Sequence, residues 1–223
     1  MTHELIFTLL YSLAFAAILL TGEVLHGVLK VRTELTRKFS HSAASLLTLT
    51  FPLVYNSYAY VVVMGSVFFL ILAIAERRKL LQSINDVDRK SYGGVLLPVA
   101  ITTSFVISVL MDSTRLFIIP ILILAISDSL AGILGMAYGH KTKKIRLFNF
   151  QLNKTYLGSG IFFITAFLGS MQALHWLYGN YSYFNLTMAL SVAAATALME
   201  ALSSKGLDNI TVPLTAILVL LMF

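Results

Sequence analysis

Eight apolar stretches, most of them long enough to cross a bilayer, follow one another along this chain of 223 residues. A transmembrane helix needs about 20 consecutive apolar residues, because the hydrocarbon core is about 30 Å thick. The stretches are Leu5–Leu29, Phe39–Val54, Tyr58–Ala75, Tyr92–Met111, Leu116–Ala137, Leu157–Tyr178, Tyr183–Ala201 and Ile210–Phe223. They predict an all-α, polytopic integral membrane protein, with about eight spans in a single domain over residues 1–223. The second and last stretches are short, so each has a re-entrant or interfacial segment as its alternative.

The basic residues test this count independently, since Lys and Arg concentrate in cytoplasmic loops. Of the 16 Lys and Arg residues, 15 fall on odd-numbered connections, and only Arg115 falls on an even-numbered one. The expected cytoplasmic loops are about 30–38, 76–91, 138–156 and 202–209, and both termini are expected on the other side. The retention of basic loops on the cytoplasmic side explains much of the net charge of +6, and attraction to anionic membrane lipids or to a phosphorylated substrate explains more. No nucleic-acid partner is needed to account for this charge.

The composition restricts where chemistry can take place. Charged residues make up 12% of the chain, against about 25% in soluble domains, and little length remains for a separate soluble domain. Any site must therefore be built from helix ends and short loops. The chain has no cysteine, which excludes disulfides, thiolate chemistry and cysteine-ligated metals.

Asp128 is the most costly of the acidic residues to keep, because it lies well inside an apolar stretch. An ionised group there costs at least about 2.5–3.5 kcal/mol and usually faces a cavity or a partner. We interpret Asp128 as a metal ligand or general base in a polar pocket open to the cytoplasm. A hydrogen-bonded packing residue is the alternative. Gly132 and Gly135 follow it, and they either allow close helix packing or let a nucleotide phosphate approach bare backbone.

A basic segment follows this stretch and ends in the sequence KTYLGSG. Lysine supplies compact positive charge, and glycine amides at a helix start supply hydrogen-bond donors, so the segment suits a polyphosphate. Positive-inside anchoring accounts for part of it, and the spacing of a Walker A loop is absent. The candidate nucleotide-binding residues are Lys141, Lys143, Lys144, Lys154, Gly132, Gly135, Gly158 and Ser159.

A third group of polar residues lies in ALMEALSSKGLDNITVPL and comprises Glu200, Asp208 and Asn209. Helix capping explains Asp208 or Asn209, but it does not explain Glu200. On the expected topology these residues share the cytoplasmic face with Asp128 and the basic segment. Carboxylates and an amide that face a phosphate-binding loop predict a Mg²⁺–nucleotide site, since Mg²⁺ prefers oxygen ligands.

Three more residues, Arg37, Lys38 and His41, open the second apolar stretch. Lys38 and His41 are three residues apart and can share a helix face. A structural hydrogen bond is the more common role of a histidine in such a position, so these residues are weaker candidates than the acidic group.

Five blocks of this sequence resemble the polyprenol kinase family, which includes dolichol, phytol and farnesol kinases and the CTP-dependent diacylglycerol kinase. In order they are RKFSH, RKSYGG, SDSLAGILGMAYG, NKTYLGS and EALSSKGLDNITVPL, and the resemblance as a whole extends from about residue 34 to the C-terminus. The last block is the most specific and, like RKSYGG, is most similar to the phytol kinase branch. Two departures, Ser127 where the family often has Gly and Leu157 where dolichol kinases have Glu, argue against a dolichol kinase.

The resemblance implies an enzyme that transfers the γ-phosphate of CTP, or of another nucleoside triphosphate, to a lipid alcohol with the help of a divalent ion. Asp128, Asp208 and Glu200 would be its catalytic residues, and with Asn209 they would hold Mg²⁺. Phytol, geranylgeraniol, a longer polyprenol and diacylglycerol all remain open as acceptors. Two alternatives are a cytidylyltransferase that makes a CDP-lipid and a small transporter, although a transporter would need polar residues that continue to the outer side.

Overall fold

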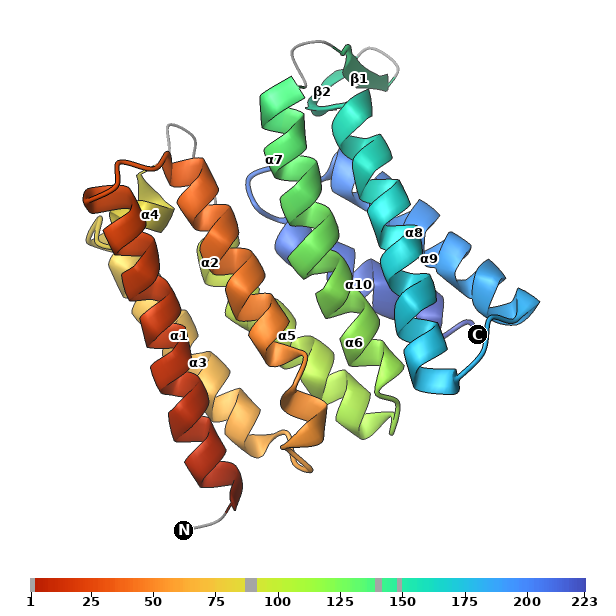
Figure 1. Cartoon of the computed structure of the whole chain (residues 1–223), viewed down its shortest axis with the longest axis horizontal. Coiled ribbons are helices and arrows are strands. Elements are labelled where there is room, and N and C mark those ends of the chain that lie inside the picture. The colour runs from red at the N-terminus through yellow and green to blue at the C-terminus, as the bar shows by residue number, and fades with distance from the viewer. Residues whose placement is uncertain (1–2, 87–91, 139–141, 148–149) are drawn as a thin grey trace.

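The computed structural model describes residues 3–86, 92–138, 142–147 and 150–223, and helices dominate this part of the chain (Figure 1). The helices are α1 (His3–Gly27), α2 (Thr33–Thr48), α3 (Ala59–Arg77), α4 (Gln82–Asn85), α5 (Gly93–Leu110), α6 (Arg115–Leu122), α7 (Asp128–Tyr138), α8 (Tyr156–Tyr178), α9 (Tyr183–Leu202) and α10 (Asp208–Leu220). A 3₁₀ turn, η1 (Phe51–Leu53), follows α2, and a π-helical turn, η2 (Ile123–Ser127), joins α6 to α7. Strands β1 (Lys144–Leu147) and β2 (Phe150–Thr155) form an antiparallel hairpin before α8.

The eight apolar stretches all lie mainly in helices, which confirms the all-α membrane class. Among the described residues, six helices are long and apolar enough to cross a membrane, namely α1, α3, α5, the continuous helix from Arg115 to Tyr138, α8 and α9. The chain is therefore an integral, multi-pass membrane protein. Of the two stretches expected to be short, α2 has 16 residues and α10 has 13, so a full crossing by either helix stays a prediction.

The start of the second helix differs from its expected position. The sequence places residues 30–38 in a loop, but α2 already begins at Thr33, so Arg37 and Lys38 lie on the helix. The apolar stretch starts only at Phe39 because the first two turns of α2 are rich in polar residues. Helix α2 is amphipathic, and these polar residues lie on the face that it turns toward the interior of the protein.

Two of the expected loops also contain regular structure. The short helix α4 lies within residues 76–91, and the β-hairpin lies within residues 138–156. Lys144–Leu147 reads KIRL, an alternation of polar and apolar residues that suits a strand with one face toward the protein. This short alternation is hidden in the basic cluster, which is why charge counting misses the hairpin.

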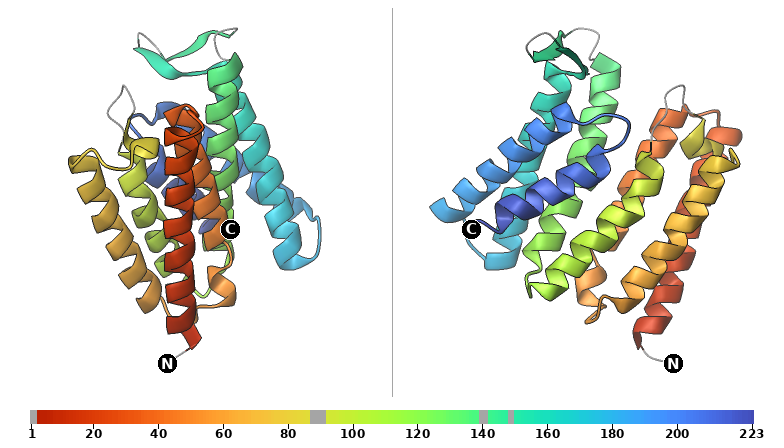
Figure 2. Two further views of the ribbon diagram at one scale, coloured as in Figure 1. Left: turned by 60° about the vertical axis from the view of Figure 1, so that its left-hand side comes forward. Right: turned by 180° about the vertical axis from the view of Figure 1, so that it is seen from behind.

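The continuous helix formed by α6, η2 and α7 runs through the centre of the molecule. Phe117, Ile119 and Ile121 are fully buried in it, and Leu124 is buried in the π-helical turn. Helices α8, α9 and α10 lie on one side of this central helix, and α1, α2 and α3 lie on the other (Figures 1 and 2). Helix α5 packs against α3 and against α10, so it links the two groups.

The π-helical turn places Asp128 at the start of α7. A π-turn frees backbone carbonyls from their usual partners, and in a membrane such groups need other donors. Two side chains of α2 meet this need: His41 Nε2 lies 3.2 Å from the Leu124 carbonyl oxygen, and Ser42 Oγ donates to the Ala125 carbonyl at 2.9 Å. The turn therefore fixes α2 against α7 at the level of Asp128.

Candidate active site

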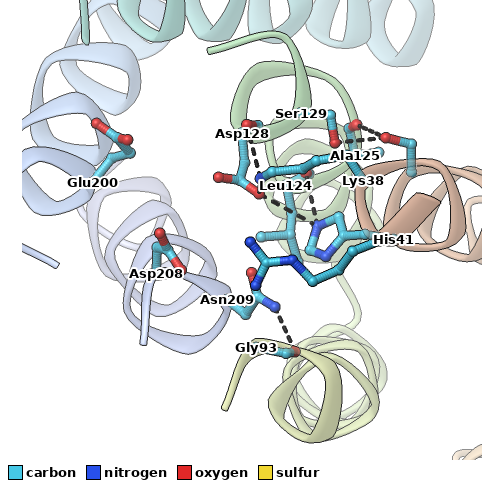
Figure 3. A network of polar contacts seen from close by, with 12 residues as sticks. Lys38, His41, Gly93, Leu124, Ala125, Asp128, Ser129, Glu200, Asp208 and Asn209 are labelled. Carbon is cyan, nitrogen blue, oxygen red and sulfur yellow. Dashed lines mark hydrogen bonds and ion pairs between the residues drawn. The ribbon is translucent and has the colours of Figure 1, made fainter. Parts of the chain in front are cut away.

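A cavity of about 510 Å³ lies between the two groups of helices. The acidic residues singled out from the sequence line it, together with basic residues from α2 and from the end of β2. These lining residues are Asp128, Glu200, Asp208, Asn209, Arg37, Lys38, His41 and Lys154. The structure therefore brings residues that are far apart in the sequence together around a single cavity. Figure 3 shows the carboxylates on facing sides of this cavity.

On one side of the cavity, Asp128 is held by α2. Its side chain is buried, with 4% of the residue exposed, and Lys38 Nζ lies 2.5 Å from Asp128 Oδ2. The same ammonium group donates to the Asp128 backbone carbonyl at 3.1 Å, and His41 Nε2 lies 3.7 Å from Oδ2. Asp128 is thus a buried carboxylate with a fixed orientation, and the opposite charge beside it favours its ionised form.

On the facing side, Lys154 at the end of β2 lies between two carboxylates. Lys154 Nζ is 2.5 Å from Glu200 Oε1 and 3.2 Å from Asp208 Oδ2, and Ser159 Oγ donates to Glu200 Oε2 at 3.2 Å. Burial works to lower the pKa of Lys154, but attraction by Glu200, Asp208 and, more weakly, Asp128 outweighs it and raises the pKa above its ordinary value. Lys154 therefore stays charged at neutral pH, and Asp128 contributes to the field at this second cluster.

Helix starts converge on the same end of the cavity. The first residues of α5 and α10 line it, and Thr155 and Gly158 line it from the start of α8. The Asn209 side chain ties two of these starts together, since its Nδ2 donates to the Gly93 carbonyl at 2.6 Å. Helix N-termini carry unpaired amide donors and partial positive charge, so their convergence favours an anion such as a phosphate chain.

The positions of the acidic residues indicate whether they could bind a divalent cation. Glu200 and Asp208 both accept from one ammonium group, so two carboxylates already point at a single cation position. Within the residues that the structure describes, no group of three or more His, Asp or Glu side chains is close enough to hold a metal by itself. The donors present therefore fit a cation such as Mg²⁺ only with further oxygen ligands, which the phosphates of a nucleotide would supply.

The glycines after Asp128 serve the packing role considered for them, and the approach of a phosphate to their backbone stays a prediction. A Cβ on Gly132 would lie 2.7 Å from Lys38 Cε, so this glycine leaves room for the lysine that binds Asp128. A Cβ on Gly135 would lie 3.8 Å from the Gly158 Cα, which shows that α7 and α8 approach closely there. Both glycines line the cavity as well.

Not all the expected nucleotide-binding lysines reach the cavity. Lys143 and Lys144 lie exposed at the start of the hairpin and are not among the residues that line it. Lys141 falls outside the described residues. Of the lysines that the structure describes in this segment, Lys154 is the one that reaches the acidic group.

Some cavity residues escape the reasoning from sequence. Thr155 caps α8 by accepting from the Gly158 amide, and the segment Ser203–Gly206 closes the cavity between α9 and α10. Gly93 and Gly94 were visible only as part of the block RKSYGG. The sequence signal for Thr155 is its place in KTYLGSG three residues before Gly158, where a threonine can cap the start of a helix.

A comparison with curated proteins finds a phytol kinase from Synechocystis sp. that is 28% identical over 208 residues, with 91% of this chain and 85% of the relative aligned. The chain is therefore similar to a phytol kinase over nearly its whole length. No family model matches the sequence, and no solved structure matches it. The similarity agrees with the resemblance of the five sequence blocks to the polyprenol kinase family.

Proposed function

We propose that this protein is a membrane-embedded lipid-alcohol kinase, which transfers the γ-phosphate of CTP to the hydroxyl of an isoprenoid alcohol such as phytol or geranylgeraniol. The observation that carries the proposal is the pair of lysine–carboxylate clusters on facing sides of one cavity, Lys38–Asp128 and Lys154–Glu200–Asp208. The similarity to a phytol kinase supports the class of acceptor.

The charges of the cavity suit a nucleoside triphosphate and its acceptor. Arg37, Lys38, Lys154 and Lys205 bring positive charge to its polar end, and the starts of α5, α8 and α10 add amide donors. Phosphoryl transfer depends mainly on positioning and on neutralising charge at the phosphate oxygens, which these groups can supply.

The chemical step needs one base and one leaving group. The hydroxyl oxygen of the alcohol attacks the γ-phosphorus, its proton passes to a carboxylate, and the bond from the γ-phosphorus to the bridging oxygen breaks to release the nucleoside diphosphate. Asp128 and Asp208 are the candidates for this carboxylate. Asp128 has the more fixed position, because Lys38 and the π-helical turn hold it.

Glu200 and Asp208, with Asn209 close by, would hold Mg²⁺ together with the phosphates, as would Asp128 if it is a second ligand rather than the base. A bound Mg²⁺ neutralises phosphate charge during transfer. Lys154 lies between Glu200 and Asp208 and donates to both. We further propose that this polar end faces the cytoplasm, since the connections that carry most of the basic residues lie there.

The test is an assay of the purified protein in detergent, with four nucleoside triphosphates crossed with phytol, geranylgeraniol, a longer polyprenol and diacylglycerol. With γ-labelled CTP, we expect the label in a lipid monophosphate extracted into organic solvent. Label that appears instead in pyrophosphate, with α-label in the lipid, would identify a cytidylyltransferase. No transfer from any nucleotide to any acceptor would contradict the kinase.

A further inference from the structure

The cavity does not end at the charged residues but continues into the apolar interior. One face of α2 shows the change, because Lys38, His41, Ala44 and Thr48 all line the cavity at intervals of three or four residues, and Arg37 lines it beside Lys38. From Arg37 to Thr48 the helix rises about 16 Å, at 1.5 Å per residue. The lining is charged at the start of this path and apolar or small at its end.

The far part of the cavity, which we call the apolar arm, is lined by α1, α3 and α5 in addition to α2. Phe15, Met64, Phe68 and Ile101 contribute apolar side chains to it. Ala44 is the smallest side chain on the α2 side and lies between the charged residues and the end of the arm. The arm is thus continuous with the polar end, and its width beside α2 depends on that alanine.

The end of the arm is closed by a tightly packed aromatic residue. Phe51 is 1% exposed, and its ring packs edge to face against Tyr11, Tyr55 and Phe105, with ring centroids 4.9, 5.4 and 5.9 Å apart. A ring fixed from several sides cannot move aside easily, because close-packed interiors resist changes of even one methylene group. The arm therefore has a definite length.

We propose that the apolar arm holds the hydrocarbon tail of the lipid alcohol, and that its closed end at Phe51 limits the length of tail that binds. The proposal rests on the proposed function and adds the specificity-determining part of the site. A hydroxyl at the polar end and a tail along α2 match the order of charged and apolar residues on that helix. Each buried methylene group of such a tail contributes about 0.8 kcal/mol, so the arm can discriminate between tails.

The experiment narrows the arm at its middle with Ala44→Leu and uses Ala17→Leu as the matched control. Ala17 is exposed on α1 and is not among the residues that line the cavity. The readout is the ratio of kcat/KM for phytol to kcat/KM for the much shorter geraniol. We expect Ala44→Leu to lower this ratio at least about tenfold, the size of effect that one added methylene group has in an apolar pocket. We expect Ala17→Leu to leave the ratio unchanged.

A second variant acts in the opposite direction and remains informative if Ala44→Leu folds poorly. Val61 is buried and lines the cavity from the start of α3, so Val61→Ala enlarges the arm. We expect this variant to raise kcat/KM for a polyprenol longer than geranylgeraniol relative to phytol.

The outcomes separate the two proposals. Wild-type protein that phosphorylates none of these alcohols contradicts the proposed function itself. Wild-type protein that is active, while both cavity variants keep the wild-type ratios for tails of all lengths, overturns the role of the apolar arm and leaves the kinase intact. If Ala17→Leu changed the ratio of kcat/KM values as much as Ala44→Leu does, that result would also overturn the role of the apolar arm.

Discussion

Lys154 occupies the position of a cation between two carboxylates. Its Nζ is close to both Glu200 and Asp208, which come from different helices, and it reaches them from the end of the hairpin. Lys143 belongs to the same basic segment but is exposed and lies outside the cavity lining. A comparison of variants at these two lysines therefore distinguishes a role in the cavity from a general role of positive charge near the membrane.

Replacing Lys154 with Met should abolish most activity and weaken the protein, because Glu200 and Asp208 then lose their shared partner. We expect kcat/KM to fall about 100-fold or more and the free energy of unfolding to fall by about 1–3 kcal/mol, the cost of a buried polar group without its partner. Lys143→Met is the matched control and should change both quantities little. Kinetics with γ-labelled CTP and thermal unfolding in detergent measure the two effects. Equal losses in both variants would assign the effect to the basic segment as a whole.

The acidic residues of the candidate site can be predicted from the sequence, because an ionised side chain within an apolar stretch costs free energy. Asp128 and Glu200 stood out for that reason, and both are now found on the cavity wall. Their partners could not be predicted, since Lys38 and Asp128 are separated by 90 positions and no local pattern connects them. Lys143 and Lys144 were also predicted from a cluster of charges in the sequence, but they do not line the cavity. A cluster of basic residues alone does not indicate which of its lysines reach the site.

Glycines set how closely some helices approach each other. Gly65 of α3 faces Thr102 of α5, and a Cβ on Gly65 would lie 2.0 Å from Thr102 Oγ1. Thr102 is β-branched, so a rotation that removes its hydroxyl brings its methyl group toward the same place. The contact between α3 and α5 therefore depends on the missing side chain.

The variant Gly65→Ala should push α3 and α5 apart and lower the free energy of unfolding by about 1–3 kcal/mol, as overpacking usually does. Gly160 of α8 gives the matched comparison, because nothing lies within 4 Å of a Cβ built there. Gly160→Ala should be neutral or stabilise by up to about 1 kcal/mol, since alanine is the better helix former. Thermal unfolding of both purified variants measures the difference, and a Gly65→Ala protein as stable as the wild type would refute the tight contact.

At the scale of whole helices, hydropathy located the elements but not all of their ends. The eight stretches correspond to helices because apolar length is a strong signal. The start of α2 was misplaced since its polar turns face the cavity rather than lipid, and the π-helical turn before Asp128 has no sequence signature. The hairpin was missed because its alternation covers only four residues on β1.

For the whole molecule, the connections that bear most of the basic residues lie at one end. Helix α4 and the hairpin are at this end, opposite the N-terminus (Figure 1). The positive-inside rule then predicts that the polar end of the cavity faces the cytoplasm. Nucleoside triphosphates are available there, so the orientation and the proposed reaction depend on each other.

Single-cysteine labelling tests the orientation directly, because the chain has no native cysteine. We expect Lys143→Cys to react with a membrane-impermeant maleimide only after the cells are permeabilised. Tyr181→Cys, an exposed position between α8 and α9, should react in intact cells. The opposite pattern would place the cavity on the outer side and contradict a cytoplasmic nucleotide site.

The two acidic clusters should act in a single reaction, and a double-mutant comparison in the γ-label assay measures this most directly. We expect Asp128→Asn and Asp208→Asn each to lower kcat/KM at least about 100-fold, and the double variant to lose little more, since groups that act as a unit are not additive. Asp112→Asn, an exposed carboxylate in the connection between α5 and α6, should retain activity. Full activity in either single variant, in protein that inserts and purifies like the wild type, would contradict one shared site.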